Sequence, residues 1–175
     1  PDGHIEKDII GNLLHVKSGK GLSKKNMDSR GEHAVYGGNG ITGHHSAYMF
    51  DEPQITIGRV GVYCGAVHIS KPKSWVSDNA LVVDEYDSSR LVFGYLAFAL
   101  EQANLNSVAD SVAQPLISGG RIYPVEIPVP PVCDQVEFVE RVKRIEAQKT
   151  AMTASLSELE DTFNALMQRA FKGEL

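Results

Sequence analysis

The residues whose types and spacing could do chemistry are basic, amide and aromatic side chains set among glycines in the first half of the chain. Lys and Arg can pair with phosphates, and Asn and Arg can hydrogen-bond base edges in a major groove. The candidate contacts are Lys20, Lys24, Lys25, Tyr36, Asn39, Arg59 and Tyr63. Such a set indicates a nucleic-acid surface. A solvated basic surface with Tyr63 and Trp75 in the core fits the residues equally well.

Other kinds of site find little support. Residues 38–43 match the dinucleotide fingerprint letter by letter, but too few residues follow before Pro53 for the helix that this motif requires. Gly19-Lys20-Gly21 lacks the hydroxyl of a phosphate loop. The histidines are scattered, with only His44 and His45 adjacent, so no metal site is predicted. No catalytic set emerges from these residues, and we predict no cofactor. A small enzyme that uses the glycine loop stays open at this point, and it would need a cofactor.

Length and charge narrow the class of protein. The 175 residues fit one compact domain, and 17 basic against 22 acidic residues leave a net charge of -5. That sign opposes a uniformly basic nucleic-acid binder. The charge is uneven, however, because residues 1–75 carry 9 basic and 7 acidic residues, whereas residues 76–133 carry 2 and 7. Two cysteines and the lack of a long apolar run suggest a cytoplasmic protein with no membrane span.

Short runs rich in Val, Ile and Tyr, bounded by Gly, Pro, Asp or Ser, predict β-strands. They cover residues 54–58, 62–69, 79–84 and 122–129. One helix is predicted between them, because apolar residues from Leu91 to Ala103 recur at helical spacing after a possible cap at Asp87, Ser88 or Ser89. We therefore expect an α+β fold with a mixed sheet and short helices.

The last part of the chain differs from the rest in its amino-acid composition. Residues 1–133 hold 15 of the 16 glycines and all 8 prolines, which places a domain boundary before residues 134–175. Asp134 can cap a helix with Glu137 three residues later, and Gly173 can end it. At about 1.5 Å per residue such a helix is roughly 55–60 Å long, so we expect much of it to project.

Apolar residues repeat along this helix at alternating spacings of four and three, which is typical of a coiled-coil seam. The seam consists of Phe138, Val142, Ile145, Lys149, Met152, Leu156, Leu159, Phe163, Leu166 and Ala170. Only Lys149 is polar, and it could specify register. An isolated helix cannot bury such a seam, so a second helix is implied, from another chain or an absent part of this one. The alternative is an amphipathic helix lying along its own domain.

The chain resembles part of the DNA-specificity subunit of type I restriction-modification systems. That part is one target-recognition domain followed by one conserved helix. The resemblance rests on the motifs YGGNGITG at 36–43, IGRVGVYCG at 57–65, SDNAL at 77–81, SVAQPLI at 111–117, IPVPP at 127–131 and AFKGEL at 170–175. Their order matches the family, and together they extend over nearly the entire chain.

The resemblance implies that the chain works with DNA and with other protein subunits. In the family, two such modules each read one half of a bipartite double-stranded DNA target, and their helices pair antiparallel as a spacer. The modification (methyltransferase) subunits dock on this assembly, and the restriction subunit joins through them, so catalysis lies in the partners. One module alone is either an excised half, a half-subunit that pairs with a second copy, or a recognition domain from a fused restriction-methyltransferase. A helix-mediated dimerisation or scaffold module without DNA binding is a further alternative.

Within this resemblance the basic residues Lys20, Lys24, Lys25 and Arg59 are expected to hold phosphates. Tyr36, Asn39 and Tyr63 are expected to lie near base edges.

Overall fold

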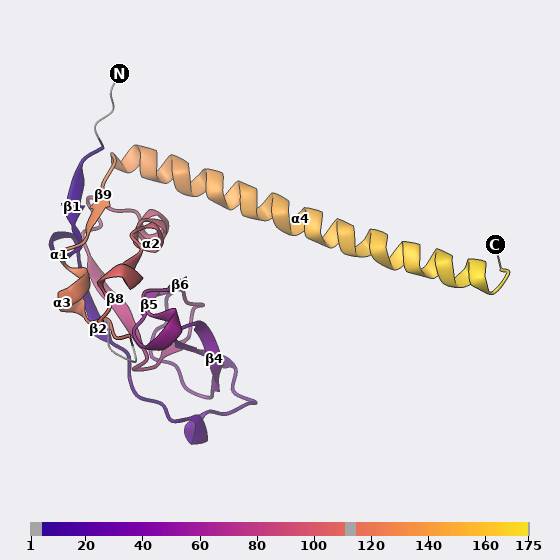
Figure 1. Ribbon diagram of the computed structural model, residues 1–175, viewed down its shortest axis with the longest axis horizontal. Helices are drawn as coiled ribbons and strands as arrows, with labels where there is room; N and C mark the ends of the chain where they lie inside the picture. The colour runs from indigo at the N-terminus through magenta and orange to yellow at the C-terminus, as the bar shows by residue number, and fades with distance from the viewer. Residues whose placement is uncertain (1–4, 111–114, 175) are drawn as a thin grey trace. The chain divides into compact units, whose positions relative to one another are not determined.

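The computed structural model describes residues 5–110 and 115–174. Its contacts divide the chain into two compact units, Pro1–Gln135 and Val136–Leu175, which are considered separately. The first unit combines antiparallel and parallel strands with short helices (Figure 1). The α+β fold with a mixed sheet is confirmed.

The largest sheet has the strand order β2-β8-β5-β6, and all its neighbouring strands are antiparallel. These strands are β2 (Leu14–Ser18), β8 (Ala80–Tyr86), β5 (Ile55–Gly58) and β6 (Val67–Ile69). Each residue of β5 is buried, as the central position of this strand requires. The sheet therefore supplies much of the core.

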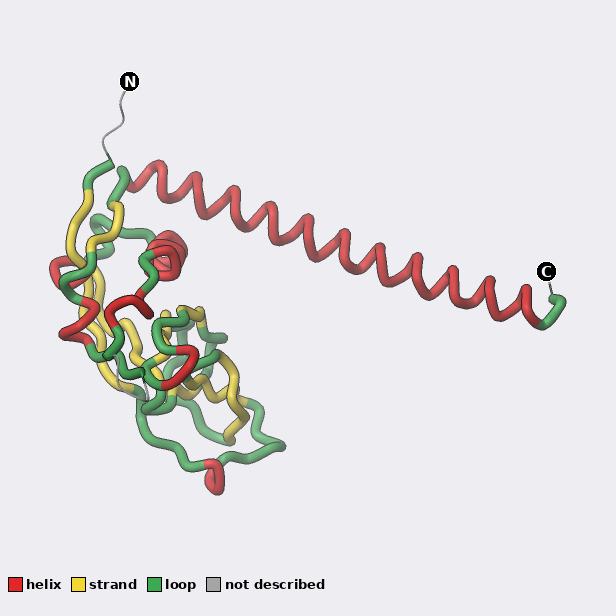
Figure 2. The backbone as a smooth tube through the Cα atoms, viewed as in Figure 1, coloured by secondary structure: helices red, strands yellow, loops and turns green. Residues whose placement is uncertain are grey.

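A second sheet has the order β4-β3-β7, formed by β4 (Gly40–His45), β3 (His33–Gly37) and β7 (Trp75–Val76). β3 pairs antiparallel with β4 and parallel with β7. A third pair joins β1 (Lys7–Ile9) to β9 (Glu126–Pro128). Figure 2 shows that many loops connect the strands of this unit. Residues that contact a ligand usually lie on such loops.

Short helices complete the first unit. They are α1 (Ile10–Leu13), α2 (Phe93–Gln102), α3 (Gly119–Ile122), and the 3-10 turns η1 (Lys24–Asn26), η2 (Gly61–Tyr63) and η3 (Leu105–Val108). α2 buries Leu96 and Leu100 completely, as its helical spacing predicts. Strand β6 is shorter than the predicted run at 62–69, because residues 61–63 form η2. Likewise Ile122 ends α3, so the run at 122–129 contains only β9.

The start of α2 differs from the prediction. The helix begins at Phe93, and the backbone N–H of Val92 at its N-cap donates to Gln135 Oε1 over 2.9 Å. Asp87 instead accepts hydrogen bonds from the N–H and hydroxyl of Ser89, which closes a turn before the helix. A cap at Asp87, Ser88 or Ser89 is therefore wrong, because the helix starts later and Val92 is its N-cap residue. A distant amide side chain bonds the N–H of that residue.

An ion cluster ties β1 to the loop before α2. Arg90 donates to Asp8 over 2.7 Å and to Glu6 over 3.0 Å. The hydrogen bond from Arg90, followed by one from Asn12, holds the pKa of Asp8 below its ordinary value. A carboxyl with a lowered folded-state pKa stabilises the fold above its unfolded pKa, and that contribution is lost as the pH falls through the folded pKa.

We predict that Arg90→Gln lowers the free energy of unfolding at pH 7, and that the difference from the wild type shrinks below about pH 4 as Asp8 and Glu6 become protonated. Urea denaturation at both pH values, followed by fluorescence of the single tryptophan Trp75, measures this. Arg30→Gln at an exposed position is the control. An equal loss at both pH values would contradict the ionic origin of the effect.

Helix α4 runs over 40 residues from Val132 to Phe171 and is unbroken in Figure 1. It begins two residues before the predicted cap, so Asp134 lies in its first turn, where a carboxylate complements the helix dipole. The predicted end is confirmed, since Gly173 has φ +71° and the N–H of Glu174 donates to Arg169 O over 2.9 Å. Among the described residues, no helix combines the length and apolarity that crossing a membrane needs.

Candidate nucleic-acid interface

Three of the sequence motifs meet at Arg59, which directly follows β5, and Gly38 of a fourth lies against the neighbouring Gly58. Its backbone N–H donates to Asn79 O over 2.9 Å, and its carbonyl accepts from the N–H of Ile117 at 2.9 Å. Its guanidinium Nη1 donates to Ser18 Oγ at the end of β2 over 3.1 Å. Segments far apart in sequence are thus joined at one residue, which we call the Arg59 junction: Ser18, Gly38, Arg59, Asn79 and Ile117.

Glycines allow the backbones at this junction to approach closely. A Cβ on Gly58 would lie 2.2 Å from Tyr63 O and 2.4 Å from Gly38 O, and one on Gly19 would lie 2.2 Å from Ser77 O. Any side chain at Gly58 would therefore push the β3–β4 turn and η2 apart. The glycine-rich run at 38–43 is a hairpin, not the strand-to-helix turn of a dinucleotide site.

The basic candidates differ in how they are held. Lys20 is exposed, and its Nζ lies 5.7 Å from the centroid of the Trp75 ring. Lys25 is exposed on η1. Arg59 is half-buried and hydrogen-bonded to Ser18. The side chain of Lys24 lies outside the described part.

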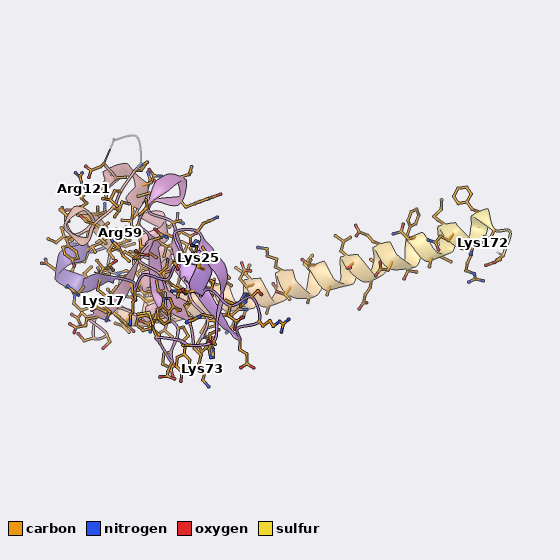
Figure 3. The ribbon with its side chains drawn as sticks, turned by 90° about the horizontal axis from the view of Figure 1, so that it is seen from below. Lys17, Lys25, Arg59, Lys73, Arg121 and Lys172 are labelled. Atoms are coloured by element: carbon orange, nitrogen blue, oxygen red, sulfur yellow. The ribbon has the colours of Figure 1, made fainter. Side chains whose placement is uncertain are left out.

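The labelled cations of the first unit are spread over its surface. Figure 3 shows Lys17, Lys25, Arg59 and Lys73 on separate parts of the first unit. Lys17 Nζ is also 3.5 Å from the carboxylate of Asp84, which neutralises part of its charge. Phosphate contacts would therefore be distributed over several loops.

The aromatic and amide candidates separate into core and surface. Tyr36 is only 5% exposed in a buried cluster with Ala34 and Val82, and its hydroxyl accepts from the N–H of Lys71 at 3.0 Å. This burial opposes the expectation that Tyr36 lies near base edges, because its side chain packs inside the cluster. Asn39 is exposed in the β3–β4 turn, and Tyr63 is 53% exposed on η2. Tyr63 is therefore not a core residue.

Sequence reasoning missed Ser18 and Val62. Ser18 is the hydroxyl that orients the Arg59 guanidinium, and no local pattern distinguishes it from other exposed serines. Val62 is 88% exposed on η2, beside Tyr63. It was hidden in an apolar run that predicts a strand, and only the glycines on both sides, Gly61 and Gly65, pointed to a turn.

The predicted seam lies on α4 and is largely uncovered. Met152 is the most exposed of its large apolar members at 73%, and Phe138 is half-buried. The other exposed apolar members are Val142, Ile145, Leu156, Leu159, Phe163, Leu166 and Ala170. Lys149 Nζ lies 3.7 Å from a carboxylate oxygen of Glu146 on the same helix. Large apolar side chains exposed in a row mark a surface for another protein segment.

Over the described ranges, no three His, Cys, Asp or Glu side chains are grouped so that they could hold a metal ion. Burial raises the pKa of the Cys64 thiol, whose Sγ lies 3.2 Å from Arg59 O. A raised pKa disfavours the reactive thiolate. The chemistry that this surface offers is hydrogen bonding and charge pairing with a ligand.

Comparison with solved structures places this fold among known ones. A structure of the S subunit of a type-I restriction-modification system from M. genitalium matches with a TM-score of 0.73 at 18% identity, over 83% of this chain and 40% of that chain. The HsdS subunit from Thermoanaerobacter tengcongensis matches with a TM-score of 0.60 at 18% identity, over 100% of this chain and 46% of that one.

Sequence comparison identifies the family. The type I restriction enzyme EcoprrI specificity subunit of Escherichia coli is 24% identical over 152 residues, which cover 85% of this chain and 37% of that subunit. The chain thus spans less than half the length of these relatives. Residues 5–161 match the family described as the type I restriction modification DNA specificity domain. The chain belongs to this family of type I restriction-modification DNA specificity proteins.

Proposed function

We propose that the first unit recognises one half of a bipartite DNA target for a type I restriction-modification system. The observation that carries this proposal is the Arg59 junction, where motifs of a DNA specificity domain converge beneath exposed Lys20, Asn39 and Tyr63. The chain itself is non-catalytic. It docks the modification subunits, and the restriction subunit joins through them, in the cytoplasm.

Each exposed candidate has a role in this proposal. Lys24 and Lys25, neighbours on η1, and Lys20, on the loop before it, pair with phosphates. The Nη2 group of Arg59, which does not reach Ser18 or Asp78, binds a further phosphate. Asn39 extends from a tight turn and bonds a base edge. Because few cations take part, the modification subunits supply much of the remaining phosphate neutralisation.

We predict that Lys20→Glu combined with Lys25→Glu weakens duplex binding by the assembled complex, and lowers the slope of log affinity against log salt by about 2, since each phosphate contact contributes about 0.9. Fluorescence anisotropy between low and physiological salt measures both quantities. Lys7→Glu combined with Lys172→Glu carries the same charge change elsewhere. An unchanged slope in the first variant, or an equal change in both, would remove the phosphate role.

We further propose that the region 134–175 is a spacer helix that pairs with another helix through its seam. The unbroken 40-residue length of α4 and its exposed apolar stripe support this role. In an antiparallel pair of two copies with every seam residue in register, Phe138 faces Ala170 and Met152 faces Leu156. That register buries all ten seam positions.

The charges beside the seam favour a partner helix of different sequence. In the antiparallel pair of two copies, Arg141 lies next to Arg169 of the other copy, and Glu146 next to its Glu160. In a parallel pair, Lys149 faces its own counterpart inside the seam. Like charges are therefore opposed in both arrangements. A helix with acidic residues opposite Arg141 and Arg169, such as one from a second half-subunit, fits this face better than a second copy.

A further inference from the structure

The turn η2 presents two apolar side chains at the surface of the first unit. Val62 is 88% exposed and Tyr63 is 53% exposed. They lie between β5 and β6, only three and four residues after Arg59. A single exposed valine is ordinary on a protein surface, so the argument depends on how this tip is built.

The backbone beneath the tip is fixed by hydrogen bonds at almost every residue. They are Gly61 N–H to Pro115 O at 2.9 Å, Cys64 N–H to Gly61 O at 3.0 Å, Gly65 N–H to Gly58 O at 2.7 Å and Ala66 N–H to Tyr63 O at 3.0 Å. Gly61 and Gly65 have φ of +80° and +87°, which only glycine adopts readily. The fold therefore holds Val62 and Tyr63 outward in one conformation, so little conformational entropy is lost when the tip binds.

The surroundings of the tip are polar but not basic. An open hollow of about 240 Å³ beside it is lined by residues that include Tyr63, Glu101, Asn104 and Asn106. Among the described residues of this lining, Glu101 alone is charged. A carboxylate repels phosphate but accepts a hydrogen bond from the amino group of cytosine, and asparagine amides pair with adenine. These groups suit base edges.

The tip is continuous with the Arg59 junction. A Cβ on Gly58 would touch both Tyr63 O and Gly38 O, so η2 and the turn that carries Asn39 lie against the same strand end. A ligand that spans Arg59 and Asn39 therefore also reaches the tip. Duplex DNA is large enough to span Arg59, Asn39 and the tip, and its stacked bases offer an apolar surface against which Val62 can pack.

We propose that the Val62–Tyr63 tip is an apolar wedge that contacts a base step of the bound duplex, with Glu101, Asn104 and Asn106 bonding the neighbouring base edges. This inference rests on the proposed DNA recognition. Apolar side chains inserted at a base step partly unstack it and bend the duplex. The cost of that deformation depends on the step, so the tip contributes to sequence selection.

The test uses the complex assembled with its modification subunits. Methylome sequencing of cells that carry the system first identifies the target motif, and the duplexes contain that motif. 2-Aminopurine reports unstacking and is placed in turn at each adenine of the motif other than the methylated one, because methyltransferases flip their target base out of the stack. Wild-type complex is expected to raise the fluorescence at one step. Val62→Ala should diminish that rise and weaken binding about fivefold, and Val62→Asp should abolish the rise. Ile69→Ala, at a 48% exposed position on β6, should change neither.

A photo-crosslinking amino acid at position 62 identifies the partner directly. Crosslinks to DNA support the wedge. Crosslinks to a modification subunit, with duplex affinity unchanged in Val62→Ala, overturn it and assign the tip to a protein contact. Normal binding with no fluorescence rise at any adenine, and none of the Val62 effects, likewise overturns the wedge while DNA recognition stands. A wild-type complex that binds no duplex overturns the proposed function and the wedge together.

Discussion

Gln135→Leu is expected to lower the free energy of unfolding of the first unit by about 2–4 kcal/mol, because it leaves three part-buried backbone groups without their side-chain partner. Gln135 is 0% exposed. Its Oε1 accepts from the N–H of Val92, and its Nε2 donates to Arg90 O over 2.7 Å and to Pro130 O over 2.8 Å. One side chain thus caps α2 and fixes the first turn of α4 within the same unit.

Urea denaturation followed by Trp75 fluorescence measures this loss, since Trp75 is the only tryptophan and lies in the first unit. Gln148→Leu, at an exposed position of α4, is the matched control and should stay within about 0.5 kcal/mol of the wild type. Gln135→Glu keeps an acceptor for Val92 but turns a buried carboxylate oxygen toward the carbonyls of Arg90 and Pro130, so at pH 7 it should destabilise at least as much as Gln135→Leu. A loss under about 1 kcal/mol in Gln135→Leu would show that water replaces the amide.

Gln135 also marks the limit of what the sequence predicts. α4 and its exposed apolar stripe were predictable because the apolar spacing is local and repeats over many turns. The cap of α2 was not, because its acceptor comes from a residue 43 positions away. Asp87 has a side chain that caps helices more often than valine does, but tertiary contacts make Val92 the N-cap residue.

The strands show the same division. β5 and β8 were predictable from runs of Val and Ile, but β3 and β4 mix glycine and histidine with few apolar residues and give little signal. The run at 62–69 failed for a different reason. Apolar composition cannot distinguish a buried strand from an exposed tip, and at Val62 the positive φ of Gly61 selects the tip.

The site was predictable in its residue types more than in its geometry. Lys20, Asn39 and Tyr63 reach the surface as expected, while Tyr36 is buried because the face of a central strand depends on its sheet. The Arg59 junction joins segments far apart in sequence through backbone hydrogen bonds. The spacing of residues along the chain does not predict such long-range contacts.

Glu160→Lys combined with Arg169→Glu is expected to convert α4 into a helix that pairs with its own copy. In the antiparallel register, Glu146 would then face a lysine and Arg141 would face a glutamate, so two repulsive contacts become attractive, each of them twice in a symmetric dimer. At a few tenths to 1 kcal/mol for each exposed pair, the dimer should tighten about 100-fold. Sedimentation equilibrium of the chain at low and high salt measures this, and salt should diminish the gain.

The apolar seam must carry the pairing if the charges only select the partner. Leu156→Asp added to the double variant should therefore abolish the dimer, because a buried carboxylate in a central layer has no counter-charge. Ser157→Asp, one residue away and off the seam, should leave the dimer intact. Glu158→Lys with Lys172→Glu repeats the charge changes away from the seam and should not promote pairing. A wild-type chain that dimerises as tightly as the double variant would instead make a second copy the natural partner of α4.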